Sequence, residues 1–291
     1  MFQFFANIFG YLLQLLYNIV NNYGLAIILF TVIIKLLQIP LSIKQQRTMI
    51  KSSKLQQKMQ VIQFKYKNNP EKMNQEIMDL YKNEKLNPFS GCFMSIVQMI
   101  LILSIFYLVK SPLTFMEKVP QESLNTYIGQ VKEAGHEISQ VYPEIDLIRE
   151  YEFLKEKNPE DINVDRLNIE MNFLGLDLSK IPQQNLTDYT VYIIPILYIL
   201  SSFVSIKMTT SMQEKMQRNE DNLIDGETGK ELQPKEEIDP MLQTNKMMSW
   251  MMPIMSISIA MVAPLGLALY WLISNILMIL ERLFLNKFIK A

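Results

Sequence analysis

The chain has 291 residues, of which 49% are hydrophobic and 20% charged, and its formal net charge is −1. The single cysteine, Cys92, excludes an intramolecular disulfide and a thiol-based metal cluster. The single histidine, His136, argues against an HExxH zinc site, which needs two histidines, and it lies outside the apolar runs where an intramembrane Ser/His protease would need it. We therefore expect neither a metal nor another cofactor.

Residues 1–22 are amphipathic. Amide side chains recur at steps of three, four or seven, while phenylalanine and aliphatic residues occupy the opposite face; the amides are Gln3, Asn7, Gln14, Asn18 and Asn21. This pattern predicts a helix that lies in the membrane–water interface, on the outer side of the membrane, with its apolar face in the lipid. A sixth membrane span is the alternative, but it would place five amides in hydrocarbon.

Apolar runs of membrane-spanning length follow. A spanning helix needs about 20 apolar residues. The runs predict an all-α integral membrane protein with five transmembrane helices, at residues 23–41, 89–110, 189–208, 247–263 and 264–282. The break between the last two spans is at Ala263-Pro264-Leu265-Gly266.

Charge is distributed unevenly between the loops. Residues 42–88 carry ten Lys/Arg against four Asp/Glu, whereas residues 111–188 carry seven against fifteen. The positive-inside rule therefore places 42–88 in the cytoplasm and the acidic loop 111–188 outside. Five spans then give an outside N-terminus, a cytoplasmic loop at 209–246 and a short cytoplasmic tail at 283–291.

The basic segment 42–88 has the pattern of a helical hairpin. Pro40 marks a helix boundary or a kink before it. Asn69, Pro70 and Glu71 supply an N-cap, a proline at the first helical position and an acid in the first turn of a second helix. A basic segment that touches anionic headgroups is a compatible interpretation.

The acidic loop contains short helical patterns, such as Glu144–Lys157, with little sustained apolar periodicity. We expect either a small peripheral element or partial disorder.

Lys35 is the most informative residue of the first span, because a lysine near the middle of a span costs about 2.5–3.5 kcal/mol. Snorkelling toward the interface is one explanation. A cation in a water-filled cavity is the other. Thr31 and Gln38 lie on its helix face. Further polar or aromatic residues stand inside the second and fifth spans: Gln98, Tyr270, Trp271, Ser274 and Asn275. Together these eight residues predict a polar groove.

Five stretches occur in order: NYGLAIILFTVIIKLLQIPLSIKQQ; LQQKMQVIQFKYKNNPEKMNQEIMDLYKNEKLNPFSGC with IVQM; FLGLDLSKIP; DPMLQTNKMMSWMMPIM; and APLGLALYWLISN. In this order they resemble the YidC/Oxa/Alb family of membrane protein insertases, in its Gram-positive form. The resemblance implies that Lys35 is the charged groove residue, where the family more often has arginine. It also implies that Thr31, Trp271 and Gln98 line the groove, and that the loops at 113–170 and 213–240 are longer than usual.

The implied function is the insertion of hydrophobic segments of nascent proteins into the bacterial plasma membrane, without enzymatic chemistry. The implied partners are nascent membrane proteins and the lipid bilayer, with the Sec translocon and the ribosome as further candidates. The chain lacks the long basic tail of ribosome-binding relatives. A transporter or channel that uses Lys35 as a pore charge is the alternative, and a structural assembly factor is a second.

Overall fold

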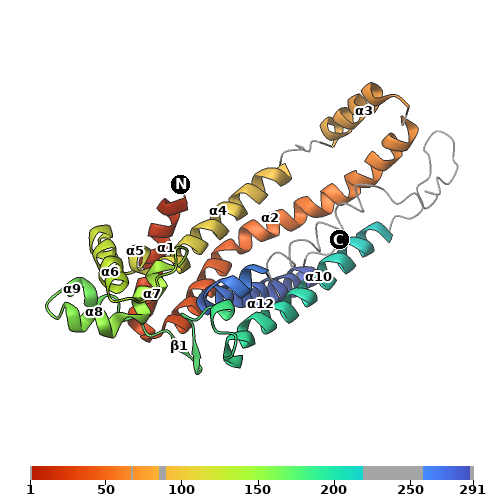
Figure 1. Cartoon of the computed structure of the whole chain (residues 1–291). Coiled ribbons are helices and arrows are strands. Elements are labelled where there is room, and N and C mark those ends of the chain that lie inside the picture. The colour runs from red at the N-terminus through yellow and green to blue at the C-terminus, as the bar shows by residue number, and fades with distance from the viewer. Residues whose placement is uncertain (1, 67, 85–89, 219–257, 289–291) are drawn as a thin grey trace. The chain divides into compact units, whose positions relative to one another are not determined.

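The computed structural model describes residues 2–66, 68–84, 90–218 and 258–288 (Figure 1). This part of the chain is mostly helical, as predicted. The chain divides into two compact units, each described here by itself. The first comprises Met1–Leu37, Gln98–Ser202 and Pro253–Met278, and the second comprises Gln38–Val97, Phe203–Met252 and Ile279–Ala291.

The longer helices are α1 (Phe2–Val20), α2 (Tyr23–Lys65), α3 (Pro70–Asn83), α4 (Ser90–Lys110), α10 (Ile193–Arg218) and α12 (Leu265–Phe288) (Figure 1). Among the described residues, four helices are long and apolar enough to cross a membrane: Phe2–Val20, Tyr23–Thr48, Tyr189–Ser211 and Leu265–Leu285. The last three overlap the predicted first, third and fifth spans.

The remaining spans are less completely described. The apolar part of α4 at Ile96–Lys110 is shorter than a full span within the described residues. Most of the predicted span at 247–263, and most of the predicted loop at 209–246, lie outside them. Because α1 also has the length and composition of a span, its predicted interfacial position stays a prediction.

Pro40 does not end the first long helix, so of the two predicted alternatives the helix boundary is wrong and the kink stays a prediction. α2 runs for 43 residues and contains Pro40 in its interior. A proline there removes one backbone hydrogen bond, to the carbonyl four residues earlier. Helices in membranes tolerate this loss because neighbouring groups can satisfy the freed carbonyl.

The start of α3 confirms the predicted cap. Asn69 accepts a hydrogen bond of 3.1 Å from the backbone N–H of Lys72, with Pro70 at the first helical position and Glu71 in the first turn. An ion pair between Lys58 and Glu84 connects α2 with the residue that follows α3. The segment therefore contains the two helices that the sequence predicts.

The acidic segment folds into a small helical element, so the expectation of partial disorder is wrong. Its helices are α5 (Pro112–Phe115), α6 (Gln121–Glu133), α7 (Pro143–Arg149), α8 (Tyr151–Lys157) and α9 (Ile162–Asp165). A hairpin of β1 (Asn172–Phe173) and β2 (Leu176–Asp177) follows, and then two 3-10 turns, η1 (Pro182–Gln184) and η2 (Tyr189–Tyr192). The helical pattern at Glu144–Lys157 is confirmed, with a break at Glu150. We call residues 111–188 the acidic domain.

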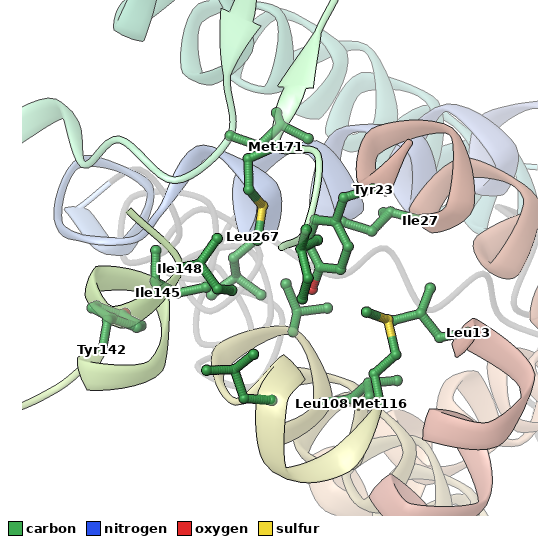
Figure 2. Close-up of a cluster of buried hydrophobic side chains, with 14 of the residues drawn as sticks. Leu13, Tyr23, Ile27, Leu108, Met116, Tyr142, Ile145, Ile148, Met171 and Leu267 are labelled. Carbon is green, nitrogen blue, oxygen red and sulfur yellow. The ribbon is translucent and has the colours of Figure 1, made fainter. Parts of the chain in front are cut away.

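A single apolar core joins the acidic domain to the long helices of the first unit (Figure 2). The labelled side chains come from α1, α2, α4, α7 and α12 and from the segments beside α5, α7 and β1: Leu13, Tyr23, Ile27, Leu108, Met116, Tyr142, Ile145, Ile148, Met171 and Leu267. Removing one such side chain from water stabilises the folded state by about 1.5–3 kcal/mol. The apolar residues of the acidic domain and those of the long helices therefore belong to one core.

Two contacts fix the position of α5: one is with α1, and the other is with α7 of the acidic domain. Gly10 of α1 packs so tightly on α5 that an added Cβ would lie 1.8 Å from the backbone oxygen of Phe115. The carboxylate of Glu144 accepts hydrogen bonds from the backbone N–H of Thr114 at 2.9 Å and from its hydroxyl at 2.7 Å. Burial raises the pKa of Glu144 above its ordinary value, against the lowering effect of these hydrogen bonds.

Candidate functional site

Lys35 lies near the middle of the candidate span Tyr23–Thr48, twelve residues or about 18 Å after its first residue. Its side chain is half-buried. It stands between the buried Ile34 and the exposed Leu36. The cation therefore belongs to a helix of membrane-spanning character, at the edge between its buried and its exposed face.

Thr31, one turn before Lys35, is buried, with 1% of its surface exposed. Its hydroxyl donates a hydrogen bond of 2.6 Å to the carbonyl of Ile27 in the same helix. A hydroxyl that donates within its helix keeps lone pairs that can accept from another group. Gln38 follows Lys35 by three residues and is half-buried. Helical periodicity thus places two polar side chains on the face of Lys35.

The four predicted site residues of α12 fall into different environments. Tyr270 is buried, and its hydrogen-bond partner is the side chain of Ser274, one turn later. Trp271 is half-buried and contacts Tyr198 of α10, with ring centroids 6.1 Å apart and planes at 36°. The indole therefore packs against an aromatic ring of α10.

Asn275 connects α12 to α10. Its side-chain amide donates hydrogen bonds of 2.9 Å to the hydroxyl of Ser201 and 3.1 Å to the hydroxyl of Ser202. Asn275 and Ser202 are both buried. A buried amide without partners would be costly in lipid, so these hydrogen bonds satisfy its donor group.

Seven residues later, Arg282 makes a second polar connection to α10, within the second unit. Its guanidinium donates hydrogen bonds to the hydroxyl of Thr209 and to the backbone carbonyl of Ser205. The sequence analysis missed this connection. The signal was present, since Ser201, Ser205 and Thr209 recur every four residues in an apolar helix, and Asn275 and Arg282 are two helical turns apart.

Gln98 lies on α4 and is half-buried. The structure thus brings together Tyr270 with Ser274, Trp271 with Tyr198, and Asn275 with the serines of α10. The pairing of Lys35, Thr31, Gln38 and Gln98 with the polar residues of α12 stays a prediction. Among the described residues, no group of three His, Cys, Asp or Glu side chains could hold a metal ion.

Comparison with known proteins identifies the family. The family model described as 60Kd inner membrane protein matches residues 15–291. Three proteins named membrane protein insertase YidC are similar to the chain. The protein of Geobacter metallireducens is 27% identical over 279 residues, which cover 96% of this chain and 36% of that relative.

The other two relatives match a shorter part. The protein of Buchnera aphidicola subsp. Baizongia pistaciae is 49% identical over 100 residues, 34% of this chain and 19% of the relative. The protein of Cupriavidus necator is 42% identical over 101 residues, 35% of this chain and 18% of the relative. The chain thus spans 36% or less of the length of these relatives. Because the family model covers nearly the whole chain, this protein belongs to the 60Kd inner membrane protein family, as a multi-pass protein of the bacterial plasma membrane.

Proposed function

We propose that this protein inserts hydrophobic segments of other proteins into the lipid bilayer. The observation that carries the proposal is the family match across residues 15–291, together with relatives whose printed name is membrane protein insertase. The half-buried Lys35 in the middle of a candidate span supports it, because a lysine at that depth is costly in hydrocarbon and a polar path lowers that cost.

The path that we propose is a groove open to the cytoplasm and to lipid. Its lining comprises Lys35, Thr31, Gln38, Gln98, Tyr270, Trp271, Ser274 and Asn275. A hydrated flank of a nascent segment enters the groove part-way, so the remaining stretch of low dielectric becomes shorter. Two features of α2 support this, the shared face of Thr31, Lys35 and Gln38 and the free accepting capacity of the Thr31 hydroxyl.

Lys35 attracts acidic side chains on the entering flank. Charges attract more strongly at low dielectric than in water, but removing both partners from water offsets much of that gain. A net contribution of about 1–3 kcal/mol follows for a charge-assisted contact. Lysine keeps the charge of an arginine but lacks its planar fork of donors, so the contact is made by a point charge.

Release uses the hydrophobic effect. Once the flank has entered, the apolar segment moves from the groove into lipid, and burial of its side chains drives the step. The sequence contains no GxxxxGK[ST] motif, and we propose no nucleotide hydrolysis.

The proposed topology has five spans, with the N-terminus outside and the C-terminus in the cytoplasm. The acidic domain at 111–188 then lies outside, and the basic hairpin at 42–88 lies in the cytoplasm, where it receives nascent segments. The charge asymmetry of the two regions supports this orientation. Participation of the Sec translocon and of the ribosome stays a prediction.

Complementation tests the proposal. The full chain is expressed in a bacterium depleted of its own insertase, beside an unrelated multi-pass protein at a matched level. We expect this chain alone to restore growth and the insertion of a reporter with a short translocated flank. A chain that reaches the membrane but restores neither would contradict the proposal. Ion flux through proteoliposomes, with no restored insertion, would favour the transporter or channel instead.

A further inference from the structure

A leucine occupies the tip of the β-hairpin in an unusual conformation. Asn172 pairs with Asp177 and Phe173 with Leu176, which leaves Leu174 and Gly175 as a two-residue turn. Both turn residues have positive φ, 53° at Leu174 and 80° at Gly175. Such turns favour asparagine or glycine, because the left-handed region crowds the Cβ of other residues.

The leucine at this position gains no packing from the protein. Its side chain is 86% exposed. An asparagine would suit the turn better, and an exposed leucine contributes nothing to the core. A residue that is disfavoured by its backbone and unpacked in the structure points to a contact outside the chain.

The hairpin is fastened to the first residues of two candidate spans. The backbone N–H of Tyr23 donates to the carbonyl of Glu170 at 3.0 Å, and the Asn22 side chain donates to the carbonyl of Asn172 at 2.7 Å. The backbone N–H of Leu265 donates to the carbonyl of Lys180 at 2.9 Å. Figure 2 shows Met171, beside β1, close to Leu267 of α12. The base of the hairpin therefore lies where α2 and α12 begin.

A third span begins beside the hairpin. The candidate span Tyr189–Ser211 starts at η2, which contacts β2. An ion pair of 2.8 Å between Lys180 and Asp188 holds the two segments together. Two large apolar side chains are exposed at this span end, Tyr189 at 85% and Leu186 at 64%. Tyrosine is enriched where membrane spans meet the headgroups.

The height of the tip follows from the strand geometry. Leu174 is two residues beyond Asn172, or about 7 Å along a strand. The headgroup region adds roughly 5–8 Å to each side of the hydrocarbon core. Asn172 is bound to Asn22, next to the first residue of α2, so the distance from the start of this candidate span to Leu174 is comparable with the thickness of the headgroup region.

We propose that the turn at Leu174, together with Leu186 and Tyr189, inserts into the boundary between headgroups and acyl chains of the leaflet at this end of the spans. Under the proposed topology this is the outer leaflet. The partner is thus the lipid surface, and the contact anchors the junction of α2, α12 and α10 at a fixed depth. The inference concerns the span ends only, and it holds whether or not the protein is an insertase.

Fluorescence quenching tests the proposal on the full chain in proteoliposomes of phosphatidylcholine and phosphatidylglycerol. In a Cys92→Ser background, an environment-sensitive fluorophore is attached at Leu174→Cys, Tyr189→Cys or Ile162→Cys. Ile162 is a matched control, since it is 73% exposed on α9 of the same domain. We expect lipids with a spin label near the headgroup to quench the first two probes several-fold more than the control.

Three results would overturn the proposal. If the probe at Leu174 is quenched no more than the probe at Ile162, the tip lies in water. If the probe at Leu174 is shielded from aqueous iodide and yet unquenched by the labelled lipid, a protein covers it. Quenching at Tyr189 without quenching at Leu174 would show that the span end contacts the membrane and the hairpin does not.

Discussion

The side-chain amide of Asn275 on α12 donates a hydrogen bond of 3.1 Å to the hydroxyl of Ser202 on α10. The contact joins two helices that each have the length and composition of a membrane span. The hydroxyl of Ser201 is a second acceptor, at 2.9 Å, and the two hydrogen bonds fix the position of the amide. Trp271 precedes Asn275 by four residues and therefore lies on the same face of α12.

A double-mutant cycle measures this connection. Asn275→Ala and Ser202→Ala should each lower the free energy of unfolding in detergent, with a coupling of about 0.6–1.7 kcal/mol between them. Ser104→Ala is the matched control, because the Ser104 hydroxyl bonds the carbonyl of Ile100 in its own helix. Additive effects of the Asn275 and Ser202 substitutions would show that the hydrogen bond contributes nothing.

Two glycines should respond in opposite directions to alanine. At Gly10→Ala the new methyl group would meet the backbone oxygen of Phe115, so α1 must shift away from α5, at a cost of about 1–3 kcal/mol. At Gly129→Ala, in the middle of α6, nothing lies within 4 Å, and a gain of about 0.5–1 kcal/mol is expected. Thermal unfolding in detergent measures both; equal shifts would contradict the packing of α1 on α5.

The acidic domain should become more stable as the pH falls. Burial raises the pKa of Glu144 in the folded protein, so the folded state binds more protons than the unfolded state between the ordinary and the raised pKa. Lowering the pH from about 7 to about 5 therefore raises the free energy of unfolding.

Glu144→Gln should reduce this pH dependence. Asp146, whose pKa burial also raises, accounts for part of the dependence that remains. The thermal midpoint across this pH range is the measurement. An unchanged pH dependence in Glu144→Gln would show that this carboxyl is not the titrating group.

Crosslinking tests the lining of the groove. A photoreactive residue at Trp271, which is half-buried, should capture a nascent membrane segment that is arrested during synthesis, and one at Thr31 should do the same. Ile162 in the acidic domain is the control position and should give no adduct. Adducts at the control alone, or at none of the three positions, would contradict the proposed groove.

Local signals were predictable from the sequence. The cap at Asn69, Pro70 and Glu71 marked the start of α3 because each residue satisfies a requirement of a helix N-terminus. The apolar runs from residues 23, 189 and 264 predicted the starts of three candidate spans to within one residue. Pro40 indicated either a helix boundary or a kink, and the boundary is excluded because α2 continues on both sides of this residue.

Relationships between distant segments were not predictable. The hydrogen bonds from Asn275 to α10 depend on which helices are neighbours, and periodicity in one helix cannot show that. The acidic domain had little periodicity because its helices are short, and each contributes only a few apolar residues to a core that it shares with the long helices. Leu174 gave no turn signal, since leucine is disfavoured in the left-handed conformation that it adopts.

The charge of Lys35 is the most direct test of the account. Insertion into proteoliposomes is compared for two substrates that differ only in an acidic or a neutral N-terminal flank. Lys35→Glu should abolish insertion of the acidic substrate and spare much of the insertion of the neutral one. Lys35→Arg should insert both substrates about as well as the wild type, because arginine keeps the cation. Undiminished insertion of the acidic substrate by Lys35→Glu would contradict the electrostatic role of this lysine.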